Sequence, residues 1–233
     1  MSDTDSFIDE VTDEVRRDRL YGVMRRYGWI AVLAVLLIVG GAAWREYRKA
    51  QDDAAAQALG DAMLAALDAD ASANRAEALG NIQGTTAGAN ATLNFMRATA
   101  QADAGEVDAA IASLDAIAVD GAVAPIYRQL AQFKSVTLKG KAAPVTDRRQ
   151  SLEALAQPGA PLRLLAEEQL ALIDIETGDA AAAVARYQAI LSDAETSPDL
   201  QQRALQVIVA LGEEPVLDGR TSQTDDTAPT DSN

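Results

Sequence analysis

The sequence predicts an all-α protein, in which a single N-terminal transmembrane helix is followed by a solenoid of about three stacked helical pairs and a capping helix. Three observations favour this class. Alanine, the residue with the highest helix propensity, is the most frequent, whereas aromatic residues make up only 4%. One uncharged apolar stretch lies near the N-terminus. Two later segments match each other at helical spacing.

The composition excludes several kinds of chemistry. The chain contains no Cys and no His, so it lacks a His general base, a Ser–His or Cys–His pair and the usual zinc, haem and iron–sulfur ligands. The net charge of −15 argues against binding to nucleic-acid phosphates. The glycine-rich stretch 84–88 lacks the Gly-Lys-Ser/Thr ending of a phosphate-binding loop. We therefore predict a protein that is not an enzyme, without catalytic residues, metal, cofactor, small-molecule substrate or nucleic-acid partner.

The first element, residues 1–26, is predicted to be a cytoplasmic amphipathic segment. Ile8, Val11 and Val15 keep helical spacing. Acids precede arginines along this segment, so its basic half lies nearest the lipid. We interpret it as a solvated helix that sets the topology; docking to the cytoplasmic loops of a membrane partner is the alternative.

The second element, residues 27–45, is predicted to be a transmembrane helix. Its 17 residues from Gly28 to Trp44 carry no charge. At about 1.5 Å per residue they reach the lower limit for crossing a ~30 Å hydrocarbon core. Aromatic residues, which favour the headgroup level, stand at both ends, namely Tyr27, Trp29 and Trp44. A buried core helix and a cleaved signal peptide are the alternatives, but the long acidic region before the stretch is unlike a signal peptide.

The basic residues on either side of this stretch predict its orientation. Five arginines precede it, at positions 16, 17, 19, 25 and 26, and three basic residues follow it, at positions 45, 48 and 49. The excess before the stretch favours a cytoplasmic N-terminus, with the C-terminal body on the other side of the membrane.

Beyond the apolar stretch, two segments repeat each other. Residues 104–117 match residues 177–190 at an offset of 73, about twice the 34-residue period of tetratricopeptide (TPR) repeats. The matched pairs are Gly105 and Gly178, Ala110 and Ala183, Leu114 and Tyr187, and Ile117 and Ile190. The glycines permit a tight reversal between helices, and the alanines let helix axes approach. A middle copy is expected to turn near residue 140.

Residues 46–211 are therefore predicted to form a TPR-like helical-repeat domain. We expect a helix over 52–68, reached through a short juncture after the membrane helix, and a looser helix over 73–81. Three helical pairs are expected over 91–119, 123–157 and 161–193, with a capping helix over 198–211. The remaining residues, 212–233, are polar and acidic and are predicted to be a disordered tail.

The order of these parts resembles the YfgM-like proteins, which are ancillary subunits of the bacterial SecYEG translocon. The resemblance is carried by residues 7–11, 14–17, 27–29 and 40–45, and it extends through the repeats to about residue 211. It implies a single-pass type II protein of the bacterial inner membrane, with a cytoplasmic N-terminus and a periplasmic C-terminal domain. The partners it implies are the SecYEG translocon, a membrane-anchored periplasmic chaperone and unfolded client chains.

Two sets of residues are predicted to bind partners. In a TPR stack the first helix of each pair lines a concave face, which here includes Phe95, Thr99, Ala102, Leu172 and Ile175. These residues lack the Lys, Arg and Asn of TPR domains that clamp a carboxylate, so apolar or helix-in-groove contact is expected. The alternative is that some of them belong to the core of the stack.

The second set is a basic island in an acidic protein. Between residues 123 and 150, six cations stand against the single acid Asp147. They are Arg128, Lys134, Lys139, Lys141, Arg148 and Arg149. They are predicted to contact an acidic partner or the anionic membrane surface. Solvation, or neutralisation of the protein's own acids, is the alternative.

The predicted function is that of a membrane-tethered TPR scaffold that assists protein export at the Sec translocon by binding the translocon, the chaperone or the emerging chain. An adaptor in envelope assembly or cell division, with no translocation client, is the alternative.

Overall fold

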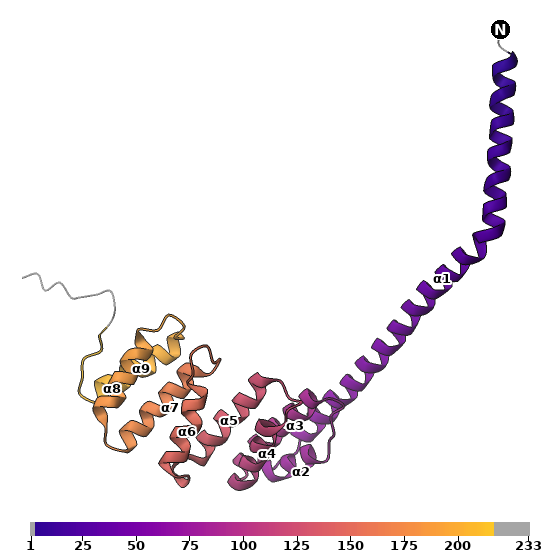
Figure 1. The fold of residues 1–233 in the computed structure, drawn as a ribbon. Helices are drawn as coiled ribbons and strands as arrows, with labels where there is room; N and C mark the ends of the chain where they lie inside the picture. Colours follow the sequence, from indigo (N-terminus) through magenta and orange to yellow (C-terminus); the bar gives the residue numbers. More distant parts are fainter. Residues whose placement is uncertain (1–2, 217–233) are drawn as a thin grey trace, which may run out of the picture. The chain divides into compact units, whose positions relative to one another are not determined.

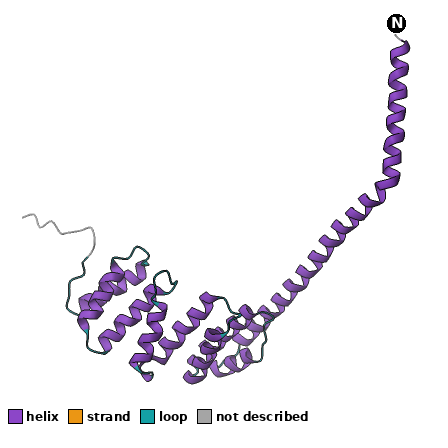
Figure 2. Ribbon diagram, in the orientation of Figure 1, coloured by secondary structure: helices purple, strands orange, loops and turns teal. Residues whose placement is uncertain are grey.

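The computed structural model describes residues 3–216, together with the side chains of residue 25 onward except Ala31. Within that range the chain is helical and contains no strand (Figures 1 and 2), so the all-α prediction is confirmed. The elements are α1 (Asp3–Leu67), α2 (Ser72–Gly80), α3 (Ala87–Asp103), α4 (Val107–Val119), α5 (Pro125–Lys139), the 3-10 turn η1 (Gly140–Ala142), α6 (Val145–Leu155), α7 (Arg163–Glu176), α8 (Ala180–Leu191) and α9 (Pro198–Ala210).

The chain divides into two units, and the first of them ends at Asp61 within α1. An 18-residue stretch of α1 has a mean hydropathy of 2.0, and none of it is buried, whereas the core helix of a soluble protein would be mostly buried. By length and composition α1 is able to cross a membrane. The side chains of residues 1–24, which carry the predicted amphipathic pattern, lie outside the described part of the structure.

The predicted juncture after the apolar stretch is absent. Residues 46–51 are helical, and α1 runs without interruption to Leu67. These six residues contain neither Gly nor Pro, so nothing in the sequence breaks the helix there.

In the second unit, which begins at Ala62, the helices from α2 to α9 each pack mainly against the next one along the chain. The core is accordingly a series of clusters that join consecutive helices. One cluster joins α5, α6 and α7 through Val136, Leu152, Leu155, Ala166, Leu170 and Ile173. Another joins α7, α8 and α9 through Ala171, Tyr187, Ile190, Leu200, Ala204 and Ile208.

The predicted match between two helical pairs is confirmed in the backbone. Gly105 lies two residues after the end of α3 and has a φ of 80°; Gly178 lies two residues after the end of α7 and has a φ of 85°. In both turns the residue after the glycine donates its N–H to a carbonyl five residues back, at 2.8 Å. A left-handed residue of this kind closes a helix and favours glycine. The matched side chains of α4 and α8 are buried in both pairs, namely Ala110, Leu114 and Ile117, and Ala183, Tyr187 and Ile190.

The match continues into the next helix. Pro125 and Pro198 begin α5 and α9, and the fully buried Ala131 and Ala204 lie at the same offset of 73. Helix α9 therefore corresponds in sequence position to α5, the helix that follows the first matched pair. Gly212, two residues after the end of α9, has a φ of 87° and lies 34 residues after Gly178.

The offset exceeds twice 34 in part because the connection from α5 to α6, residues 140–144, is longer than the corresponding connections within the other two pairs, residues 104–106 and 177–179. Helix α5 ends at Lys139, close to the turn expected near residue 140, and Gly140 adopts a positive φ of 46°. The 3-10 turn η1 and Pro144 then separate α5 from α6.

Part of the predicted tail lies against the helical body. Gln188 of α8 bonds to both backbone groups of Val216: its Oε1 accepts from the Val216 N–H at 2.9 Å, and its Nε2 donates to the Val216 carbonyl. Residues 217–233, the rest of the predicted tail, lie outside the described residues.

Candidate functional site

A groove of about 400 Å³ lies between α3 and α5, over α4. Its lining residues come from all three helices: Ala98, Thr99, Ala102 and Asp103 from α3, Leu114 from α4, and Phe133, Lys134, Thr137 and Leu138 from α5. All of them belong to the second unit of the chain.

Helical spacing explains the shape of the groove. Ala98 and Ala102 are four residues apart on one face of α3, and their small side chains leave space beside the helix. On α5, Lys134 and Leu138 have the same spacing, and the larger Phe133 adds apolar surface. The α3 side of the groove is therefore lined by small side chains and the α5 side by larger ones.

The walls of the groove are largely apolar, because its two threonine hydroxyls are hydrogen-bonded within their own helices. Thr99 and Thr137 donate their hydroxyl groups to carbonyls of their own helices, those of Phe95 and Phe133, at 3.0 and 2.8 Å. These hydroxyls are therefore occupied within the helices. Asp103 and Lys134 are both exposed, so they place one charge of each sign beside the apolar surface.

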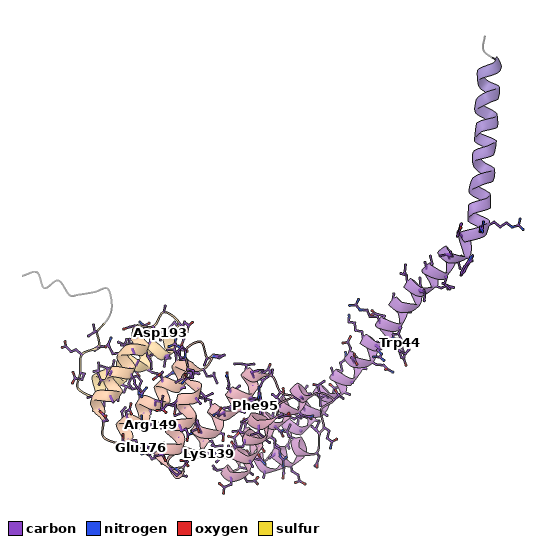
Figure 3. All side chains as sticks on the ribbon, in the orientation of Figure 1. Trp44, Phe95, Lys139, Arg149, Glu176 and Asp193 are labelled. Carbon is purple, nitrogen blue, oxygen red and sulfur yellow. The ribbon has the colours of Figure 1, made fainter. Side chains whose placement is uncertain are left out.

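The five residues predicted to line a concave face are divided between sites. Thr99 and Ala102 lie in the groove. Phe95, which Figure 3 labels, packs against two core clusters between α3, α4 and α5. Ile175 packs against the α7–α9 cluster. For Phe95 and Ile175 the structure therefore supports the alternative, a position in the core.

Leu172 lies elsewhere, beside a small groove of about 60 Å³ between α5, α6 and α7. Its side chain is 43% exposed. Arg148 and Glu176, which pair with each other, also line this groove. It is too small for more than a single side chain or a few water molecules.

Sequence reasoning missed most of the α5 wall. Of its members only Lys134 was predicted, as part of the basic island, whereas Phe133, Thr137 and Leu138 were not. The 34-residue period contained the missing signal, because adding it to Thr99 gives Phe133.

Three of the six cations of the basic island are paired inside the fold. Lys139 lies 3.0 Å from Asp115 on α4, Arg148 lies 2.6 Å from Glu176, and Arg149 lies 2.8 Å from Asp174. Figure 3 labels Lys139, Arg149 and Glu176 at these positions. For these three cations the structure supports the alternative, in which they neutralise the protein's own acids.

The other three cations of the island form no ion pair within 4 Å among the described residues. Lys134 and Lys141 are exposed, and Arg128 is half-buried. Partner binding by the basic island is therefore best tested by reversing the charges of Lys134 and Lys141. Reversing Arg148 or Arg149 would also break contacts that hold the helices together.

The ion pairs of α7 shift the pKa values of their carboxyl groups. The hydrogen bond from Arg148 holds the pKa of Glu176 below its ordinary value. The pKa of Asp193 is lowered by the backbone N–H of Glu195 and by Arg163. Both carboxylates are thus kept ionised by fixed partners, as expected of structural contacts.

Burial also raises the pKa of the Tyr187 phenol to about 12. Tyr187 is 1% exposed and belongs to the α7–α9 core. Its hydroxyl therefore stays protonated at physiological pH, and its role is packing.

The groove between α3 and α5 is suited to holding apolar side chains of another polypeptide. Among the described residues no group of three His, Cys, Asp or Glu side chains is placed to hold a metal ion. No protein-family model, no curated protein and no solved structure matches the chain.

Proposed function

We propose that this chain is a membrane-tethered, TPR-like scaffold that binds polypeptide segments and assists protein export at the Sec translocon. The observation that carries the proposal is the repetition of a helical pair. The α3–α4 and α7–α8 pairs share a turn glycine, a turn hydrogen bond and a set of buried residues at one offset. Stacked helical pairs of this period are protein-binding platforms in TPR proteins.

The tether is supported by α1. Its uncharged stretch is exposed and apolar enough to cross a bilayer, and the excess of arginines before it favours a cytoplasmic N-terminus. The helical body would then lie in the periplasm of a bacterial cell. Confinement beside a membrane channel raises the effective concentration of the body, so weak contacts suffice for function.

The proposed contact surface is the groove between α3 and α5. Its apolar walls and flanking Asp103 and Lys134 fit an apolar segment of a partner protein or an emerging chain. The resemblance to YfgM-like proteins favours the translocon and a membrane-anchored periplasmic chaperone as further partners. A carboxylate clamp is not expected, because the groove contains only one cation.

Photo-crosslinking in native membranes tests this proposal. A photoreactive amino acid replaces Thr99 in the groove, and a matched protein carries it at Gln206, an exposed residue of α9. We expect adducts with translocon subunits, a periplasmic chaperone or exported chains from position 99 and not from position 206. Adducts with cell-division or cell-wall proteins alone would contradict the export role and favour the envelope adaptor.

A further inference from the structure

Three cations at the end of the apolar stretch form no ion pair with an acid among the residues whose side chains the structure describes. Arg45, Arg48 and Lys49 share one face of α1, because they are spaced by three and four residues. Every ion pair within 4 Å in the described part of the chain lies between Asp115 and Arg203. Like charges at this spacing repel one another, so a counter-anion from outside the protein would stabilise them.

Acidic residues are available nearby but are not used. Glu46 lies three residues before Lys49, and Asp52 lies four residues after Arg48. Neither forms an ion pair with these cations among the described residues. In contrast, Arg148, Arg149 and the other paired cations of the helical body reach their carboxylates at 2.6–3.0 Å.

An exposed aromatic pair adjoins the three cations. The rings of Trp44 and Tyr47 lie 6.5 Å apart, and their residues are 62% and 60% exposed. The Arg48 guanidinium lies 5.4 Å from the centre of the Trp44 ring, and Gln51 donates to the Tyr47 hydroxyl at 3.0 Å. Figure 3 labels Trp44 on α1. Amphipathic rings of this kind favour the boundary between hydrocarbon and water.

The spacing along α1 matches the depth of a phospholipid headgroup. From Arg26 to Arg45 the helix rises about 28 Å, close to the ~30 Å thickness of the hydrocarbon core. Arg48 and Lys49 lie about 5 Å farther along the helix axis. The headgroup region extends about 5–8 Å beyond the hydrocarbon on each side, so both cations fall within it.

We propose that Arg45, Arg48 and Lys49, together with Trp44 and Tyr47, form a binding site for anionic phospholipids. The cations bind the phosphate and the negatively charged headgroup, and the two rings pack beside the glycerol and the upper acyl chain. The cation–π contact turns Arg48 toward the apolar stretch and thus toward the phosphate layer. This inference rests on the proposed membrane anchoring of α1.

Quenching of tryptophan fluorescence by brominated lipids tests the site. The chain has two tryptophans, so Trp29→Phe leaves Trp44 as the only fluorophore. This full-length protein is reconstituted into vesicles of phosphatidylcholine and phosphatidylglycerol, with one of the two lipids brominated at a time. We expect phosphatidylglycerol to be preferred at Trp44, by up to roughly five-fold for each cation.

Two double variants in the same Trp29→Phe background locate the preference. In Arg48→Gln/Lys49→Gln the preference for phosphatidylglycerol should fall several-fold, toward that of a zwitterionic lipid. The matched control Arg75→Gln/Arg203→Gln removes two cations of the helical body that lie outside the groove and the basic island, and it should keep the preference. Equal quenching by both lipids in the parent protein, or equal losses in both variants, would overturn the site.

Extraction with alkaline carbonate separates this inference from the proposed function. A chain that is released from the vesicles would contradict the membrane anchoring itself. A chain that stays in the membrane but is quenched equally by the two lipids would contradict only the lipid site.

Discussion

A single buried carboxylate joins three consecutive helices. Asp174 of α7 is 3% exposed and accepts hydrogen bonds from Arg149 of α6 and Arg186 of α8, at 2.8 Å each. The two guanidinium groups offset the cost of burying its charge. In the earlier pair the equivalent residue is Gln101, which accepts a hydrogen bond from Ser113, the equivalent of Arg186. The two pairs thus have a polar contact between their helices at the same position, but it is an ion pair in one and a hydrogen bond between neutral groups in the other.

The turn glycines allow a matched pair of substitutions. Gly178→Ala places a side chain at a φ of 85°, whereas Gly88→Ala adds one in the first turn of α3 with no other atom within 4 Å. We expect Gly178→Ala to lower the free energy of unfolding by about 1–2 kcal/mol. Gly88→Ala should leave it unchanged or raise it slightly. Urea unfolding of the detergent-solubilised protein, followed by circular dichroism, measures both, and equal effects would contradict the role of the turn.

The ion pair of Glu176 predicts a loss of stability in acid. Because Arg148 holds the Glu176 pKa below its ordinary 4.5, the folded protein binds this proton less readily than the unfolded chain. The stability it contributes is therefore complete above pH 4.5 and is lost as the pH falls through the lower pKa of the folded state. Glu176→Gln should show a smaller drop in Tm between neutral and acidic pH. The control is Glu153→Gln at an exposed carboxylate, and its Tm should follow that of the parent protein.

At the scale of the element, α9 is the last packed helix of the described residues 3–216. It corresponds to α5 at the offset of 73 residues, but equivalent side chains of the two helices differ in how far they are exposed. Val136 of α5 is 6% exposed and lies in the cluster that joins α5 to α6 and α7. Its equivalent on α9, Val209, is 61% exposed, and the neighbouring Gln202 and Gln206 are exposed as well. A largely polar outer face of this kind is typical of a helix that closes the end of a stack.

Adjacent residues of α9 test its role as a cap. Ile208 is fully buried in the α7–α9 cluster, whereas Val209 faces outward. Ile208→Ala should lower the free energy of unfolding by about 2–4 kcal/mol and reduce the hydrogen-exchange protection of α8. Val209→Ala should change it by less than about 0.5 kcal/mol. Similar effects of the two substitutions would show that α9 does not complete the core.

At the scale of the whole molecule, the two units of the chain differ in the exposure of their apolar side chains. In the body the buried residues form a series of clusters between successive helices. In α1 the large apolar side chains of the uncharged stretch are exposed, which in water would be unfavourable. The proposed membrane anchoring would place these side chains in the bilayer, whereas the second unit supplies its own core.

A charge in the middle of the uncharged stretch tests the tether. Leu36→Arg places a cation at its centre, at a cost of about 2.5–3.5 kcal/mol on insertion scales. We expect a smaller fraction of the chain to resist alkaline carbonate extraction from membranes. The control Ala56→Arg adds the same charge to an exposed position of α1 beyond the stretch and should not change this fraction. Equal extraction of both variants would contradict a role of the stretch in anchoring.

Much of the fold could be predicted from the sequence because its helix boundaries are marked by single residues. Pro125 and Pro198 begin helices, Gly105 and Gly178 follow them, and their spacing shows the repeat. The partners of the basic island could not be predicted, because Lys139–Asp115 and Arg148–Glu176 span 24 and 28 residues. Pairs within one helix follow from spacing, but pairs between helices depend on how far each helix is rotated against its neighbour.

The contact between Gln188 and Val216 determines which substitutions are tolerated at position 216. The Gln188 side chain forms its hydrogen bonds with the main-chain N–H and C=O of Val216, and Val216 is 64% exposed. Any residue with an N–H group is therefore acceptable at position 216, and proline alone removes the donor. Most side chains at position 216 can therefore be exchanged without loss of the two hydrogen bonds that attach this backbone to α8.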